Sequence, residues 1–191
     1  MKKTVKTQGE RRAETQAAVL QSACKLFGIH GYNKTSLEDI AADCSTTIRP
    51  IYHYFKNKKN LFKVVTETYE NQLVDALSAV DAKHEEASSD PLMYWQTFSQ
   101  MASDASFRQV VLIDSPHILG RERWTNTAVV VKATEIIQRQ FPSLQALNQT
   151  LITRMLIGAL SEAAMVFAEA EDTEGEALLT QISSLVSLFI K

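Results

Sequence analysis

The stretch from Thr35 to Leu61, which reads TSLEDIAADCSTTIRPIYHYFKNKKNL, constrains the fold of this chain more than any other part of the sequence. It contains a short helical pattern, a turn of Ser and Thr, and a second short helix with aromatic side chains and a basic end. This order is typical of a helix-turn-helix unit, whose second helix lies in the major groove with its N-terminal side chains on base edges. Ser36 and Thr47 are predicted to cap the two helices, and Pro50 lies in the first turn of the second, where its missing N–H costs little.

Two segments of this region, GYNKTSLEDIA and IYHYFKNKKNLF, resemble the DNA-binding domain of the TetR family of bacterial repressors. The family pattern has a long first helix ending in LF and GY, then T-[ST]-x-x-x-I-A, a turn, and L-Y-x-H-F-x-x-K-x-x-L. The resemblance covers roughly the first third of the chain. The matching residues are Leu26, Phe27, Gly31, Tyr32, Thr35, Ser36, Ile40, Ala41, Ile51, Tyr52, Phe55, Lys58 and Leu61. The chain departs from the pattern in the turn, where G-V-S-x-G reads Ser45-Thr46-Thr47-Ile48-Arg49, and at the common His, which is Tyr54 with His53 beside it.

The rest of the chain shows helical periodicity, and the sequence predicts an all-α fold of about nine helices. We expect an N-terminal three-helix helix-turn-helix DNA-binding domain and a C-terminal helical ligand-binding and dimerisation domain. The expected divisions are a basic disordered arm at 1–9, the DNA-binding domain at 10–56 and the larger domain at 57–191. Asn57 is predicted to cap the helix that enters the larger domain, and residues 84–90 are the best linker candidate. The expected helices outside the helix-turn-helix are 10–29, 57–83, 91–102, 106–113 (stopped by Ser115-Pro116), 121–141, 144–170 and 176–190.

Composition favours a compact cytoplasmic protein. The 45% hydrophobic content argues against disorder, and the absence of a run of 18 apolar residues argues against a transmembrane helix. The basic N-terminus has no apolar segment behind it, as a signal peptide would. Cys24 and Cys44 fall at apolar helix positions and are therefore expected to be buried free thiols in a reducing cytosol. No cofactor, no metal and no membrane partner is expected.

Charge is distributed unevenly along the chain. Residues 1–63 carry a net charge of +7 and the remainder carries −9, so a basic head is joined to an acidic body. With the helix-turn-helix pattern, the basic head indicates contact with the phosphates of double-stranded DNA. The candidate DNA-contacting residues are Arg11, Arg12, Lys34, Ser36, Thr46, Thr47, Arg49, Pro50, Tyr52, His53, Tyr54 and Lys58.

These candidates have different expected roles. Arg49 begins the second helix, where its guanidinium can bind O6 and N7 of a guanine; a phosphate contact or a free surface arginine is the alternative. Lys58 is expected to bind a phosphate together with the N-terminus of its own helix. Tyr52, His53 and Tyr54 would pack on the sugar-phosphate backbone or on thymine methyl groups, although at least one of the three is expected to belong to the core.

The helices at 144–170 and 176–190 carry apolar residues on more than one face, more than a monomer's surface helix needs. An isologous four-helix interface in a homodimer would bury the surplus. The resemblance implies the same arrangement. The alternative is that both faces are covered within one subunit.

The resemblance also implies a cavity for a small-molecule inducer among the middle helices, whose filling separates the paired DNA-binding heads. Bulky side chains of this kind belong to the core more often than they line a cavity, and the segment IDSPHILGRERW could equally hold surface ion pairs. Its arginines hint at an anionic or carboxylate ligand. The candidates are Tyr69, Tyr94, Trp95, Phe98, Phe107, His117, Arg121, Trp124 and Met155.

We therefore expect a ligand-responsive transcriptional regulator, and specifically a repressor, that binds a pseudo-palindromic operator as a homodimer. One alternative is a helical small-molecule-binding protein or enzyme that uses Asp114 and His117 and has no DNA role; neither residue has a nucleophile at a useful spacing. The other keeps the fold but gives the head a protein partner.

Overall fold

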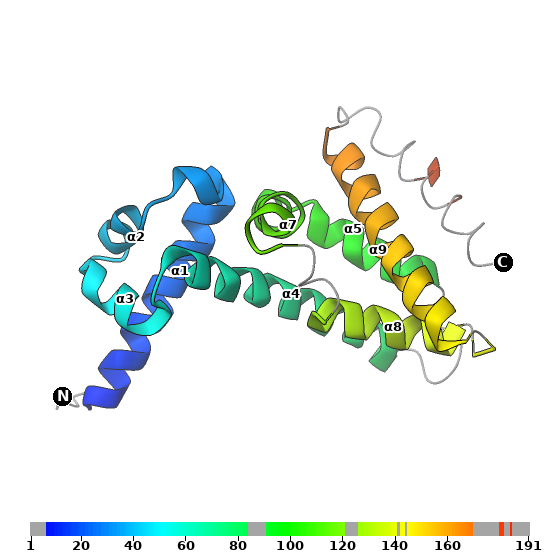
Figure 1. The fold of residues 1–191 in the computed structure, drawn as a ribbon, viewed down its shortest axis with the longest axis horizontal. Coiled ribbons are helices and arrows are strands. Elements are labelled where there is room, and N and C mark those ends of the chain that lie inside the picture. Colours follow the sequence, from blue (N-terminus) through cyan, green and yellow to red (C-terminus); the bar gives the residue numbers. More distant parts are fainter. Residues whose placement is uncertain are drawn as a thin grey trace.

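The computed structural model describes residues 7–83, 91–120, 126–140, 142–143, 145–169, 180–181 and 184. Within these residues every regular element is a helix, which confirms the predicted all-α fold (Figure 1). None of these helices is long and apolar enough to cross a membrane. The elements are α1 (Gln8–Lys34), α2 (Leu37–Asp43), α3 (Ile48–Phe55), α4 (Lys58–Lys83), α5 (Pro91–Ala102), α6 (Ala105–Phe107), the π-helix η1 (Arg108–Asp114), α7 (Ser115–Ile118), α8 (Ala128–Gln140) and α9 (Ala146–Glu169).

Helices α1, α2 and α3 form a head at one end of the molecule, and the long helix α4 leads from this head into a body made of the later helices (Figure 1). The head closes around Phe27, Ile40 and Ile51, which are fully buried. Phe62 of α4 is fully buried against the same cluster, with its ring centroid 5.2 Å from that of Phe27. The head and the start of α4 therefore share one apolar core.

Polar side chains cap the starts of α2 and α4 as the sequence predicts, whereas the start of α3 differs. The Ser36 hydroxyl accepts a hydrogen bond from the Asp39 N–H at 3.0 Å, and the Asp39 carboxylate accepts one from the Ser36 N–H at 2.9 Å. The Asn57 side chain accepts from the Asn60 N–H at 2.8 Å at the start of α4. These two predicted caps are confirmed. Thr47 occupies the N-cap position of α3, but its side chain makes no capping hydrogen bond in the described structure, so the cap predicted there was wrong.

Helix α1 is longer than expected. The sequence predicts that Gly28 and Gly31 mark its end near residue 29, but α1 continues to Lys34. Gly28 is buried, and a Cβ there would lie 2.5 Å from the Cβ of Ser106, so this glycine permits close packing of α1 on α6. The backbone leaves helical geometry only at Gly31, with φ 75° and ψ 169°, a conformation that glycine adopts readily.

Two further helix boundaries in the body differ from the prediction. The helix expected to stop at Ser115-Pro116 continues as η1 and α7, because Pro116 falls in the first turn of α7, where no N–H is required. Helix α8 begins at Ala128 and not near 121, since the Thr127 hydroxyl accepts from the Val130 N–H at 3.2 Å and caps it there. The helix expected at 176–190 and the linker at 84–90 fall outside the described residues.

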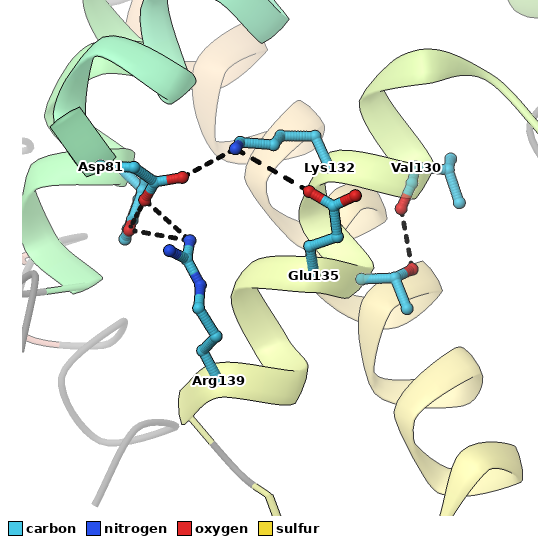
Figure 2. Close-up of polar contacts among 7 residues, drawn as sticks. Asp81, Val130, Lys132, Glu135 and Arg139 are labelled. Carbon is cyan, nitrogen blue, oxygen red and sulfur yellow. Dashed lines mark hydrogen bonds and ion pairs between the residues drawn. The ribbon is translucent and has the colours of Figure 1, made fainter. Parts of the chain in front are cut away.

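Near the far end of α4, the Asp81 carboxylate is held by three donors from α5 and α8. Its Oδ1 accepts from the Tyr94 hydroxyl at 2.5 Å and from the Arg139 guanidinium at 2.7 Å. Its Oδ2 accepts from the Lys132 ammonium at 2.7 Å. The same Lys132 Nζ also lies 3.9 Å from Glu135 Oε2 (Figure 2). Burial alone would raise the pKa of Asp81, but these three donors outweigh it and lower the pKa to about 2.

Asp81 should make a pH-dependent contribution to stability. A carboxyl whose folded pKa of about 2 lies below its ordinary value of 3.8 stabilises the fold above that ordinary value and loses this contribution as the pH falls to about 2. The free energy of unfolding of the wild type should exceed that of Asp81→Asn by roughly 2 kcal/mol near pH 7, and the difference should shrink between about pH 4 and pH 2. Urea titrations of both proteins across this pH range measure the difference in free energy of unfolding. The same difference at about pH 7 and at about pH 2 would contradict the prediction.

Candidate nucleic-acid interface

Helix α3 presents its polar side chains to solvent because its apolar residues face the head's core. Ile51 is fully buried and Phe55 is 5% exposed. On the other side of the helix Arg49, Tyr52 and His53 are exposed. The predicted recognition helix therefore has a free outer face about two turns long.

The remaining candidates around α3 are partly enclosed. Tyr54 is half-buried and packs on the core, with its ring centroid 5.1 Å from His53 and 6.4 Å from Phe55. Pro50 and Thr46 are half-buried, and Thr47 is exposed. Of the three aromatic candidates, Tyr54 is thus the one that contributes to the core.

A surface cleft of about 350 Å³ lies beside α3, where the end of α1 meets the starts of α2 and α4. It brings together four of the predicted DNA-contacting residues, which come from three separate places in the sequence. Backbone N–H groups at the starts of α2 and α4 are close to this cleft, and such N–H groups favour phosphate oxygens. The cleft is lined by Asn33, Lys34, Thr35, Ser36, Leu37, Glu38, Tyr52, Asn57 and Lys58.

The Lys58 ammonium lies over the Tyr32 ring, 4.2 Å from the ring centroid. This cation–π contact orients a long side chain that would otherwise sample many rotamers. Burial lowers the pKa of Lys58, and the nearby negative charge of Asp114 opposes that shift. Lys58 is therefore a pre-positioned cation at the wall of the cleft.

Asp114 reaches the head from the body and fixes the end of α1. Its Oδ2 accepts from the Tyr32 N–H at 2.7 Å and from the Gln109 side-chain amide at 3.1 Å. A Cβ at Gly31 would lie 3.0 Å from the Gln109 amide nitrogen and 3.2 Å from this carboxylate. The sequence interpretation did not give Asp114 this role, because a contact across 82 residues leaves no local pattern.

A second cleft, of about 340 Å³, separates the first half of α1 from the turn before α3. It brings the candidates Arg11 and Thr46 together, whereas Arg12 is exposed on α1 and does not line it. In this turn Ser45 takes the left-handed conformation with φ 52°. Ser45 stands where the resembling pattern has its first glycine, which accounts for the family's preference at that position.

The candidate ligand residues do not form one group. Phe107 is fully buried in the core and packs edge-on against Tyr69, with centroids 6.2 Å apart. Tyr94 binds Asp81, while Trp95 is 2% exposed and lies 6.0 Å from the Phe98 ring.

Two of the other four candidates are described by the structure. His117 is exposed, and Met155 is 62% exposed on α9 because that helix has an apolar face not covered by the described residues. Arg121 and Trp124 lie outside the described residues. The described aromatic rings are thus buried or half-buried, whereas His117 and Met155 are exposed, a difference that the sequence pattern alone could not show.

Comparisons with known proteins agree over both parts of the chain. A family model described as "Bacterial regulatory proteins, tetR family" matches residues 19–65, and one described as "Tetracyclin repressor-like, C-terminal domain" matches residues 92–189. The chain is similar to the HTH-type transcriptional regulator YxaF of Bacillus subtilis, with 25% identity over 162 residues, which are 78% of this chain and 84% of YxaF. It is also similar to the HTH-type transcriptional repressor ComR of Escherichia coli, with 35% identity over 80 residues, which are 42% of this chain and 35% of ComR.

Solved structures give the same result. A TetR-family transcriptional regulator from Pectobacterium atrosepticum is 27% identical, with a TM-score of 0.64 over 96% of this chain and 95% of that one. A similar fold occurs in a regulator from a Shewanella species, with a TM-score of 0.69 at 19% identity, over 91% of this chain and 94% of that one.

Proposed function

Because this chain belongs to the TetR family of bacterial regulatory proteins and carries a helix-turn-helix DNA-binding domain, we propose that it is a cytoplasmic, homodimeric repressor of a pseudo-palindromic operator. A small molecule bound between the helices of the body would lower its affinity for that operator. In this proposal residues 10–56 bind DNA, residues 57–191 bind the ligand and the second subunit, and residues 1–9 form a basic arm.

The cleft beside α3 carries the DNA-binding part of the proposal. It places Lys34, Ser36 and Lys58 next to the exposed face of the recognition helix, and Tyr52 belongs to both surfaces. A phosphate in the cleft would meet two cations and the N-terminus of α4. With α3 in the major groove, Arg49 would then face base edges.

Two variants should separate phosphate binding from base reading. Lys58→Ala should weaken binding to every duplex alike and reduce the slope of log affinity against log salt by roughly one, since one phosphate contact is lost. Arg49→Ala should lose about 1–3 kcal/mol at one base pair and affect non-specific binding less. Fluorescence anisotropy with duplexes selected from a random pool, at several salt concentrations, measures both effects.

Lys63→Ala is the matched control, since Lys63 is an exposed lysine of the same helix that does not line the cleft. Its salt slope should stay near that of the wild type. If Arg49→Ala instead weakens all sequences uniformly, Arg49 is a phosphate contact and its assignment to a base is wrong.

The outer face of α9 supports the homodimer. Leu151, Met155 and Val166 are 56%, 62% and 51% exposed, respectively, and Ala159 is exposed between them. Spacings of four and seven residues place them on one side of a helix. A second copy of this chain would cover such a face by an isologous contact.

The interior of the body supports the ligand response. Among the residues that the structure describes, the buried Trp95 Nε1 has no hydrogen-bond acceptor. A buried donor of this kind is stabilised when a ligand or water accepts from it. Helix α4 joins this region to Lys58, so one rigid element connects the two proposed sites.

The enzyme alternative has less support. The Asp114 carboxylate accepts two hydrogen bonds at the junction of head and body, and His117 is exposed. The relatives are named as transcriptional regulators. If duplex selection enriched no sequence and binding showed no salt dependence, the DNA-binding proposal would fail and a protein partner for the head would be favoured.

A further inference from the structure

The three donors that hold Asp81 come from the body, whereas Asp81 itself belongs to the helix that enters the head. Tyr94 lies on α5, and Lys132 and Arg139 lie on α8. Lys132 and Arg139 are seven residues apart, about two helical turns, so both side chains project from the same face of α8 (Figure 2). The donors therefore form one group, and the carboxylate that they hold is supplied by another element.

This group has the composition of a carboxylate-binding site. A phenol, an ammonium and a guanidinium converge on both oxygens of one carboxylate, at distances between 2.5 and 2.7 Å. Without Asp81, the acidic partner that remains for the two cations among the described residues is Glu135, whose Oε2 lies 3.9 Å from Lys132 Nζ, so the charge of this group would be +1. That charge matches a monocarboxylate better than a dianion.

The site combines enclosure with a route to solvent. The side chains of Lys132 and Asp81 are 13% and 18% exposed, whereas that of Arg139 is 50% exposed. Lys132 would be costly to leave without a counter-charge, because ammonium groups shielded from water need one. An incoming carboxylate near Arg139 could supply it as Asp81 departs, so no cation would remain unpaired after the exchange.

Displacement of Asp81 would act on the DNA-binding head through α4. Asp81 lies two residues before the end of α4, and Lys58 at its other end lines the cleft beside α3. The bonds of Asp81 tie the far end of α4 to α5 and α8. Their loss would allow α4 to change its angle to the body, and Lys58 would move with it.

We propose that Tyr94, Lys132 and Arg139 form the subsite for a carboxylate of the effector, and that Asp81 occupies this subsite in the ligand-free protein. The effector is a monocarboxylate with an apolar part, which displaces Asp81 and releases α4. The apolar part is needed because Asp81, tethered in place, has a high effective concentration that a small free carboxylate cannot match. This inference rests on the proposed ligand response.

The test empties the subsite and refills it with acetate. In Asp81→Ala, 100 mM sodium acetate should raise the melting temperature by roughly 3–5 °C over sodium chloride at equal ionic strength. The wild type should shift by less than about 1 °C, because its own carboxylate fills the subsite. Asp75→Ala, which removes an exposed carboxylate from the same helix, should behave as the wild type. Adding Lys132→Met to Asp81→Ala should abolish the acetate effect.

DNA binding provides a readout that a merely structural ion pair would not change. Folded Asp81→Ala should bind a selected operator about 5–150-fold more weakly than the wild type, the usual range for allosteric coupling. Acetate should raise its melting temperature without restoring this affinity, since acetate fills the subsite but does not connect it to α4. If Asp81→Ala does not fold, the same affinity loss is expected for the near-isosteric Asp81→Asn.

Two results would overturn the inference. One is an acetate shift in Asp81→Ala no larger than in Asp75→Ala, and the other is an unchanged operator affinity once the folded fraction is taken into account. Failure of the proposed function is separate, because it would appear as wild-type protein that selects no operator at all.

Discussion

The double substitution Leu151→Arg and Met155→Arg should convert the protein into a folded monomer with little operator affinity. Both side chains are more than half exposed, at 56% and 62%, so neither arginine disturbs the core of the subunit. In the proposed dimer, however, each pair of guanidinium groups would be buried near its symmetry copies. Burying like charges without partners costs several kcal/mol, which exceeds what a few apolar contacts can offset.

The double variant should lose much of its operator affinity, because a dimer binds two half-sites at once and a monomer binds one. Linked binding exceeds the affinity of one module by about 10²–10⁴-fold, and a monomer loses this factor. Analytical ultracentrifugation and anisotropy on the same samples measure both effects. Val131→Arg on α8 is the control, since Val131 is 53% exposed but lies outside the proposed interface. A double variant that remains dimeric would show that α9 does not form the interface.

Phe62→Ala should remove about 3–5 kcal/mol from the free energy of unfolding. The Phe62 ring is fully buried, with centroids 5.2 Å from Phe27 and 5.0 Å from Tyr32, so it joins α4 to α1. Its removal leaves a cavity between two long helices that cannot close without moving the head. A loss of this size is a large part of the 5–15 kcal/mol that stabilises a typical domain.

Urea denaturation measures the effect of Phe62→Ala directly. Tyr52→Ala is the control, since Tyr52 is 51% exposed and its removal should change stability by less than about 0.5 kcal/mol. DNA affinity of the Phe62 variant should also fall, because the Tyr32 ring that supports Lys58 loses one of its neighbours. A stability loss below about 1 kcal/mol would mean that the head and α4 do not share a core.

The sequence predicted best what local chemistry determines. Ser36 and Asn57 cap their helices because a short polar side chain beside free N–H groups is satisfied within three residues. Ile51 and Phe55 are four residues apart and therefore lie on one side of α3. Both are buried, so the polar side chains on the opposite side face solvent. The candidates Lys34, Ser36, Tyr52 and Lys58 line one cleft, and two of the helices that border it, α2 and α4, begin at these caps.

Tertiary contacts determine what the sequence could not predict. Gly28 resembled a helix end, although its role is to admit Ser106, a residue 78 positions away. The aromatic pattern could not distinguish the core residue Phe107 from a cavity wall, since both are apolar positions of a helix. The Asp81 group was missed because its partners Lys132 and Arg139 lie 51 and 58 residues further along the chain.

Selection of duplexes from a random pool, followed by hydroxyl-radical footprinting of the enriched sequence, tests the central claim most directly. A dimer with α3 of each subunit in the major groove should enrich an inverted repeat with half-site centres one DNA turn, about 34–36 Å, apart or a multiple of it. The footprint should show two protected half-sites on the same face of the duplex. Enrichment of a single half-site, or of no sequence, would contradict the account.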